Sequence, residues 1–222
     1  MKIRSLNELS EFLDTEFAWR RRELTALSSD IRAADAARRA FRLRAGVALL
    51  YAHWEGFVKQ AAEAYLSYVA VQRLRLDELS PSFLGLALRR RLHELAESNE
   101  AACHTAFAQL ILRGLGQNAS IPVEGVADTG ANLNSARLKR IVLTLGLDYS
   151  GYELKEHLID NKLLNWRNGV AHGREIYPDE SEFNEVYLEI TGLIRQFKDQ
   201  VENAAVLRSF RAVPRTPALP VN

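Results

Sequence analysis

The sequence predicts an all-α protein, an up-and-down helical bundle with additional helices. Apolar residues recur at steps of three, four and seven positions through most of the chain, which is the period of amphipathic helices. No segment shows the sustained alternation of apolar and polar residues that predicts a strand. Hydrophobic residues make up 47% of the chain and charged residues 26%, enough to bury an ordinary globular core.

The first two predicted helices occupy the N-terminal third. Ser5 can cap the first helix, with Glu8 as its capping-box partner, and an apolar stripe follows as far as Leu27. The second is expected as one long helix over residues 31–71, because Gly46 and Gly56 are too isolated to count as breaks.

A third helix is predicted to begin at Ser80-Pro81. The serine hydroxyl can cap free backbone donors, and proline lacks the N–H that would be unpaired in the first turn. This helix is expected to end near residue 97 and to continue or restart over residues 100–115. Residues 116–133 are rich in glycine and small polar residues without a sustained period, so we expect a loop there.

The C-terminal half is predicted to contain three further helices, over residues 134–145, 153–171 and 181–210. Residues 212–222 contain three prolines and are predicted to form a disordered tail. Since composition does not shift elsewhere, residues 1–211 are expected to form a single domain.

Charge and cysteine content exclude several classes of protein. The 29 Lys and Arg residues balance 28 Asp and Glu residues, so any contact with RNA must be local. Cys103 is the only cysteine, which excludes an internal disulfide and favours a reducing, cytoplasmic location. The longest apolar run, residues 45–52, is far shorter than the ~20 residues that span a bilayer, so a soluble protein without membrane contact is expected.

The most informative segment is residues 165–173, Asn-Trp-Arg-Asn-Gly-Val-Ala-His-Gly, at the end of a predicted helix. Arg167 and His172 stand five positions apart, a spacing that is weak evidence by itself. In a straight helix this spacing corresponds to a rise of about 7.5 Å and a rotation of about 140°, so the two side chains would not converge on one phosphate. A second copy of the chain, or a distortion at the helix end, is therefore needed.

The context of this segment resembles the HEPN superfamily. Residues 167–173 resemble the Arg-polar-three-residues-His signature of HEPN ribonucleases. Residues 54–57, Trp-Glu-Gly-Phe, resemble a helix of the MAE-type HEPN subfamily, and residues 132–160 resemble the spacer that precedes its Arg. Together these matches cover roughly residues 40–200. The resemblance implies a homodimer with both motifs in one cleft, RNA as substrate, no cofactor, no metal, and products with a 2′,3′-cyclic phosphate.

The residue types suit such a reaction. Histidine titrates near neutral pH and can give or take a proton, whereas a guanidinium stays charged and binds two phosphate oxygens at once. We expect His172 to act as general base or acid, Arg167 to hold the phosphate and Asn168 to orient Arg167 or the RNA. Glu55 is a candidate support for an Arg or His of the site. Arg174 and Tyr177 are further candidates for RNA contacts, or are simply exposed.

Other interpretations stay open. His172 and Gly173 suit an ordinary helix end, with a cation at the negative end of the dipole and a left-handed cap. The chain could then be a non-catalytic helical module that binds RNA, a nucleotide or a protein. An unbroken helix over residues 92–110 would align His93, Glu97, Glu100 and His104 on one face as metal ligands, but Ser98-Asn99 favour a break there.

The resemblance also suggests a biological role in a toxin–antitoxin or antiviral defence system, with a cognate antitoxin or defence protein as partner. HEPN toxins that are silenced by adenylylation carry a Tyr two residues after the His. This chain has Arg174 at that place, which argues against control by a nucleotidyltransferase antitoxin.

Overall fold

The computed structural model describes residues 2–176 and 178–213. This part of the chain contains eight α-helices and no strand, apart from two isolated β-bridges, so the predicted all-α fold is confirmed. The helices are α1 (Leu6–Ala33), α2 (Ala36–Ala70), α3 (Pro81–Glu97), α4 (Ala101–Gln109), α5 (Ser135–Thr144), α6 (Ser150–Glu153), α7 (Asn165–Ala171) and α8 (Glu180–Val206). Short η segments cover Leu76–Glu78 (3₁₀), Leu110–Gly114 and Leu158–Leu164 (both π).

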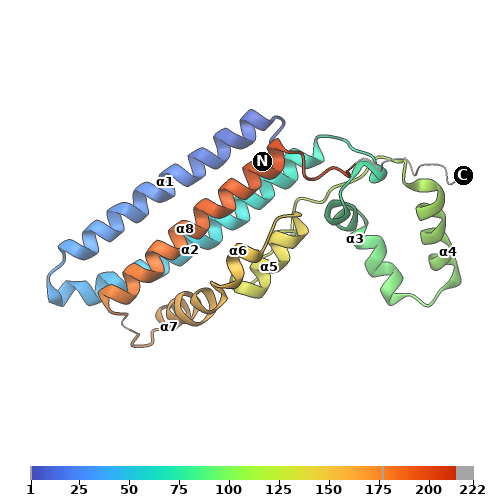
Figure 1. The fold of residues 1–222 in the computed structure, drawn as a ribbon. Coiled ribbons are helices and arrows are strands. Elements are labelled where there is room, and N and C mark those ends of the chain that lie inside the picture. Colours follow the sequence, from blue (N-terminus) through green and yellow to red (C-terminus); the bar gives the residue numbers. More distant parts are fainter. Residues whose placement is uncertain (1, 177, 214–222) are drawn as a thin grey trace, which may run out of the picture.

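The three longest helices form the body of the molecule. α1, α2 and α8 run side by side, and the shorter helices α5, α6 and α7 lie along one side of this bundle (Figure 1). Their inward faces carry large side chains with no exposed surface, among them Trp54, Phe57 and Phe197. Burial of such side chains contributes roughly 1.5–3 kcal/mol each, so this core holds the helices that frame the candidate site.

The boundary between α1 and α2 differs from the prediction. Residues 31–33 were expected to open the second helix, but they complete α1. The break lies at Ala34 and Asp35, where the Asp35 carboxylate accepts a hydrogen bond from the Arg38 N–H at 2.9 Å and caps α2. The sequence signal for a break between the two helices was weak here, because Asp35 is a capping residue with no glycine or proline beside it.

The ends of the last helix were also predicted only approximately. α8 begins with a capping box formed by Asp179 and Glu182 and ends at Val206, before the predicted residue 210. Arg208 ends it with a φ of 53°, a left-handed conformation that glycine or asparagine more often supplies. The chain then turns so that Phe210 packs edge-on against Tyr65, Tyr68 and Phe83.

α3 and α4 project from one end of the bundle as an arm (Figure 1). α3 starts with Pro81 at its first turn as predicted, although the Ser80 hydroxyl pairs with Ser82 Oγ at 3.2 Å and does not cap the helix. The chain restarts as α4 after a break at residues 98–100, and α4 buries none of its side chains.

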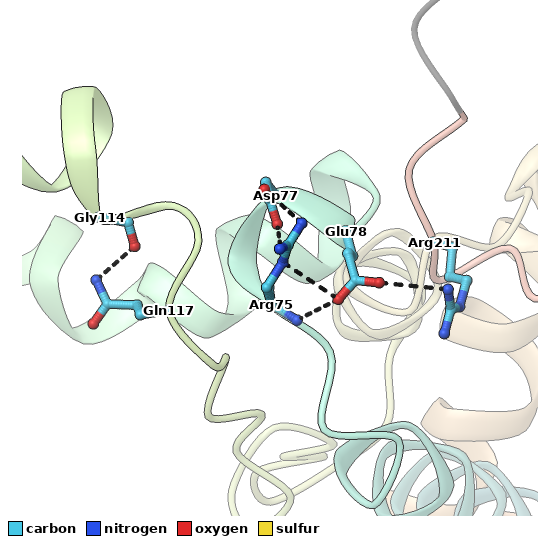
Figure 2. A network of polar contacts seen from close by, with 6 residues as sticks. All are labelled: Arg75, Asp77, Glu78, Gly114, Gln117 and Arg211. Carbon is cyan, nitrogen blue, oxygen red and sulfur yellow. Dashed lines mark hydrogen bonds and ion pairs between the residues drawn. The ribbon is translucent and has the colours of Figure 1, made fainter.

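The base of the arm is fastened by a polar network around the 3₁₀ segment Leu76–Glu78 (Figure 2). Arg75 pairs with Asp77 at 3.0 Å, and Glu78 lies 3.6 Å from Arg211 of the C-terminal segment. Backbone hydrogen bonds from Leu76 and Asp77 to residues 115–117 join the same segment to the loop after α4. Three stretches far apart in the sequence therefore meet here.

Two expectations concern residues beyond this description. Tyr177 and residues 214–222 of the predicted tail lie outside the described residues. Within residues 2–176 and 178–213, no helix combines the length and the apolar character needed to cross a membrane.

Candidate active site

The Arg167–His172 segment lies at the end of a continuous helical stretch. The π-helical turn Leu158–Leu164 leads directly into α7, and such turns often occur at functional sites. α7 ends with the N–H of Gly173 bonded to the Val170 carbonyl and that of Arg174 to the Gly169 carbonyl. With Gly173 at a φ of 69°, these bonds form a Schellman motif, so the left-handed cap expected at Gly173 is present.

His172 occupies the C-cap position of α7. Its φ of −94° and ψ of 13° depart from helical values, so the helix ends at the histidine itself. The side chain is exposed and forms no hydrogen bond or ion pair with other described residues. An imidazole in this position is accessible to a substrate.

Arg167 is half-buried and points the other way, toward α2 and the loop before α5. Its Nη1 donates to Asn168 Oδ1 at 2.9 Å and to Asn132 Oδ1. Its Cζ lies 4.8 Å from the centre of the Tyr51 ring, a cation–π distance. All three partners are uncharged, so the positive charge of Arg167 is not neutralised by a neighbouring carboxylate. The Arg167 Nε and Nη2 atoms have no hydrogen-bond partner among the described residues.

The loop that supplies Asn132 is held from several sides. The Leu133 N–H donates to the Tyr51 hydroxyl at 2.6 Å, and Ser135 donates through its N–H and its hydroxyl to Asp160 at 2.8 and 2.5 Å. Arg137 Nη1 donates to the carbonyls of Thr129 and Asn132, both at 2.8 Å. These bonds fix the Asn132 amide beside Arg167, which reduces the entropy lost when the site forms.

Tyr51 connects Arg167 with Glu55. Burial, and then the charge of Glu55 one helical turn away, raise the pKa of Tyr51 to about 12, so its hydroxyl stays protonated. The hydroxyl accepts the Leu133 N–H, and the Glu55 carboxylate lies near it. Glu55 forms no ion pair with Arg167 or His172 and reaches the site through Tyr51.

Of the remaining predicted residues, Asn168 contacts Arg167 and Arg174 does not. The Arg174 side chain is exposed, and its carbonyl accepts a hydrogen bond from Arg44 of α2 at 2.8 Å. Arg167 and His172 form no hydrogen bond with each other within one chain.

Two contributors to the site were not assigned by sequence reasoning. Asn132 entered the sequence analysis only as the first residue of the spacer, and Tyr51 was assigned no role in the site. The sequence signal that could have identified Asn132 is its place at the end of a glycine-rich loop, just before the helix cap Asn134. Nothing in the neighbouring sequence links Asn132 to Arg167. The contact spans 35 residues of sequence.

The alternative metal site on the arm is not assembled. α3 ends at Glu97 and α4 begins at Ala101, so the four candidate ligands do not share one helix face. Among the described residues, no group of three or more His, Cys, Asp or Glu side chains is placed to hold a metal ion.

Comparison with protein families decides the relationship. The family model for RiboL-PSP-HEPN matches residues 15–203, which include α2, the spacer and the Arg167–His172 segment. The chain belongs to the RiboL-PSP-HEPN family. Membership of the HEPN superfamily, expected from the sequence motifs, is thereby confirmed. No curated protein and no solved structure matches this HEPN chain significantly.

Proposed function

We propose that this HEPN protein is an endoribonuclease that cleaves RNA without a metal ion, at a cleft formed by two copies of the chain. Arg167 carries the proposal. The buried Arg20 is neutralised by the Glu16 carboxylate. Arg167 instead is held by amide oxygens and a ring face, which orient it and leave its charge for an anion.

The proposed reaction is a transesterification. One imidazole removes the proton of the ribose 2′-OH, and the 2′-oxygen attacks phosphorus. The bond from phosphorus to the 5′-oxygen breaks, and a protonated imidazole gives its proton to that oxygen. The products are a 2′,3′-cyclic phosphate and a 5′-hydroxyl. Arg167 stabilises the negative charge that builds on the phosphoryl oxygens, a contribution typically worth several kcal/mol.

Two histidines are required for this scheme, and each chain supplies one. The exposed stripe Ala45, Ala48 and Ala52 of α2 supports a two-fold contact beside the site. From helical geometry, Ala48 lies about 40° around the axis from Arg44 and about 20° from Glu55, so the stripe flanks the site residues. Small side chains allow two helices to approach closely, and an isologous contact would bring both motifs to one axis.

The first experiment measures cleavage of mixed RNA by the purified protein in EDTA. The wild type is expected to cut, and Arg167→Ala and His172→Ala are each expected to lose at least ~100-fold of the rate, as loss of a general acid–base or charge-stabilising group usually causes. Arg22→Ala and His157→Ala remove exposed side chains of the same types and serve as controls. RNA binding without cleavage across pH 5–8 would favour the non-catalytic module.

A second experiment separates a shared cleft from two independent sites. Wild-type and His172→Ala proteins are mixed, unfolded and refolded together, so that mixed dimers with a single His172 form. If one cleft needs the histidines of both chains, these mixed dimers are expected to be inactive, whereas two independent sites would leave each mixed dimer half of the wild-type rate. Mixed dimers, verified by mass spectrometry, that keep half of the rate would contradict the shared cleft.

We further propose a toxin or defence role. Induced expression of the wild type is expected to arrest bacterial growth, whereas Arg167→Ala is expected to be tolerated at equal protein level. A neighbouring gene whose product restores growth would identify the antitoxin. Arg174 stands where adenylylated HEPN toxins carry Tyr, so the antitoxin is expected to act by a contact that does not modify this position.

A further inference from the structure

The outer seam between α1 and α8 contains a groove that the proposed nuclease site does not use. Two hollows of about 370 and 360 Å³ lie along it. Thr25, Tyr187 and Leu188 line both, so the hollows are continuous. The groove is lined by residues 17–32 of α1 and 184–195 of α8.

The lining of this groove is basic. Arg20, Arg21, Arg32 and Arg195 line it, and no carboxylate does. Arg20 is neutralised by Glu16, but the other three are exposed and form no ion pair with described residues. The guanidinium carbons of Arg21 and Arg195 lie 6.0 and 5.9 Å from the centre of the Phe17 ring.

The acids of the same helix stretches are engaged elsewhere. Three of the four carboxylates within residues 17–32 and 184–195 are paired with a cation on another element. The pairs are Asp30 with Arg42, Glu185 with Lys162 and Glu189 with Lys155, at 2.7–3.0 Å. The fourth, Glu23, lies 3.0 Å from the His53 imidazole and does not line the groove. The positive charge of the groove is therefore left for an outside partner.

The groove also offers apolar surface. Leu188 is 66% exposed at the point where the two hollows meet, and Phe17 and Leu24 lie beside it. An apolar floor with cationic edges fits an amphipathic helix that buries one face and carries acids along its flanks. Residues 17–32 extend about 22 Å, which corresponds to roughly four turns of such a helix.

We propose that this groove binds an acidic amphipathic helix of a partner protein, laid along the α1–α8 seam. The two aromatic rings of the groove already have partners, because two arginines contact Phe17 and Tyr187 stacks on Phe183, which makes them poor platforms for nucleobases. The chain's own residues 214–222 contain no acid and do not have the required charge. The proposal does not depend on nuclease activity.

The test uses a display library of random 16-residue peptides selected on the full chain. Enriched peptides are expected to contain Glu or Asp together with Leu at steps of three and four. Their affinity is expected to fall at least tenfold for Arg21→Glu/Arg195→Glu and about fivefold for Leu188→Ser. Arg22→Glu/Arg208→Glu reverses two exposed arginines that do not line the groove and is expected to bind the same peptides unchanged.

Four outcomes would overturn the proposal. Enriched peptides could lack acids, or could bind the charge-reversed variant as well as the wild type. A single-stranded oligouridine could bind with the same dependence on Arg21 and Arg195, which would assign the groove to RNA. Loss of self-association in Arg21→Glu/Arg195→Glu, measured by sedimentation, would assign it to a second copy of this chain.

Discussion

Asn132 illustrates how a residue outside the motif can set the geometry of the arginine that we propose to be catalytic. Its amide oxygen accepts from Arg167, and the surrounding loop is tied to Tyr51, Asp160 and Arg137. Asn132→Ala is expected to lower the cleavage rate about tenfold, because a misdirected guanidinium binds the transition state less well. The fold should persist, so the melting temperature provides the parallel measurement.

Asn132→Asp keeps an acceptor at the same place but pairs Arg167 with a carboxylate, so this variant is expected to hold the guanidinium in place without recovering the rate. Asn161→Ala removes an exposed amide in the neighbouring π-helical turn and should leave the rate unchanged. Equal rates for Asn132→Ala and the wild type would assign Asn132 to loop structure alone.

His53 makes stability depend on pH. It is buried between Trp19 and Glu23, and burial lowers its pKa below the ordinary 6.5, although Glu23 opposes the shift. Below pH 6.5 the unfolded chain therefore binds a proton that the folded chain does not. The free energy of unfolding should fall on acidification from pH 6.5, by at most about 1.4 kcal/mol per pH unit, and level off below the folded pKa.

Urea unfolding of the wild type and His53→Gln at pH 5.5, 6.5 and 7.5 would measure this dependence. The difference in unfolding free energy between the two proteins should shrink as the pH falls. A difference that stays constant over this range would show that another group controls the acid response.

The site residues that are close together in the sequence were predicted, whereas those that are far from the motif in the sequence were not. Arg167, Asn168 and His172 stand within six positions, so their pattern is visible in one segment. Tyr51 and Asn132 join them only after α2 and the loop before α5 have packed against α7. No local periodicity specifies that packing.

Among the elements, α7 depends on a close approach at Gly169. A Cβ at this position would overlap the side chain of Ile176, which lies just after the Schellman turn. Gly169→Ala is expected to push the turn away, displace His172, and reduce cleavage roughly tenfold or more. It should also destabilise the protein by about 1–3 kcal/mol despite the better helix propensity of alanine.

Gly85 of α3 is the matched control, because a Cβ there meets no atom within 4 Å. Gly85→Ala is expected to stabilise the protein by about 0.5–1 kcal/mol and to leave cleavage unchanged. If both substitutions stabilise equally, the Gly169 contact does not constrain the turn.

The helices themselves were largely predictable, and their ends were less so. The amphipathic period indicated each of the long helices, because a helix that buries one face carries a stripe of apolar residues along that face. The misplaced ends involve Asp35 and Arg208, where a single cap or a left-handed arginine ends a helix without a glycine. The π-helical turn at Leu158–Leu164 was not foreseen, because its wider winding leaves no distinct mark in composition.

For the whole molecule, activity is expected to depend on pairing through α2. Ala48→Glu would place two carboxylates close together in the proposed isologous contact, without affecting the core of one chain. The variant is expected to be monomeric and at least ~100-fold less active, with unchanged helicity. Sedimentation and circular dichroism are the measurements.

Ala136→Glu on the exposed side of α5 is the control and should remain dimeric and active. A monomeric but fully active Ala48→Glu protein would show that one chain carries a complete site. A dimeric Ala48→Glu protein would place the contact on another face.

The arm formed by α3 and α4 has a consequence for how this architecture can vary. Because α4 buries no side chain completely and packs only Phe107 against the core, the stretch around residues 97–101 can accept a longer or shorter connection at small energetic cost. An engineer could therefore insert a fluorescent reporter there while the bundle continues to fold as before.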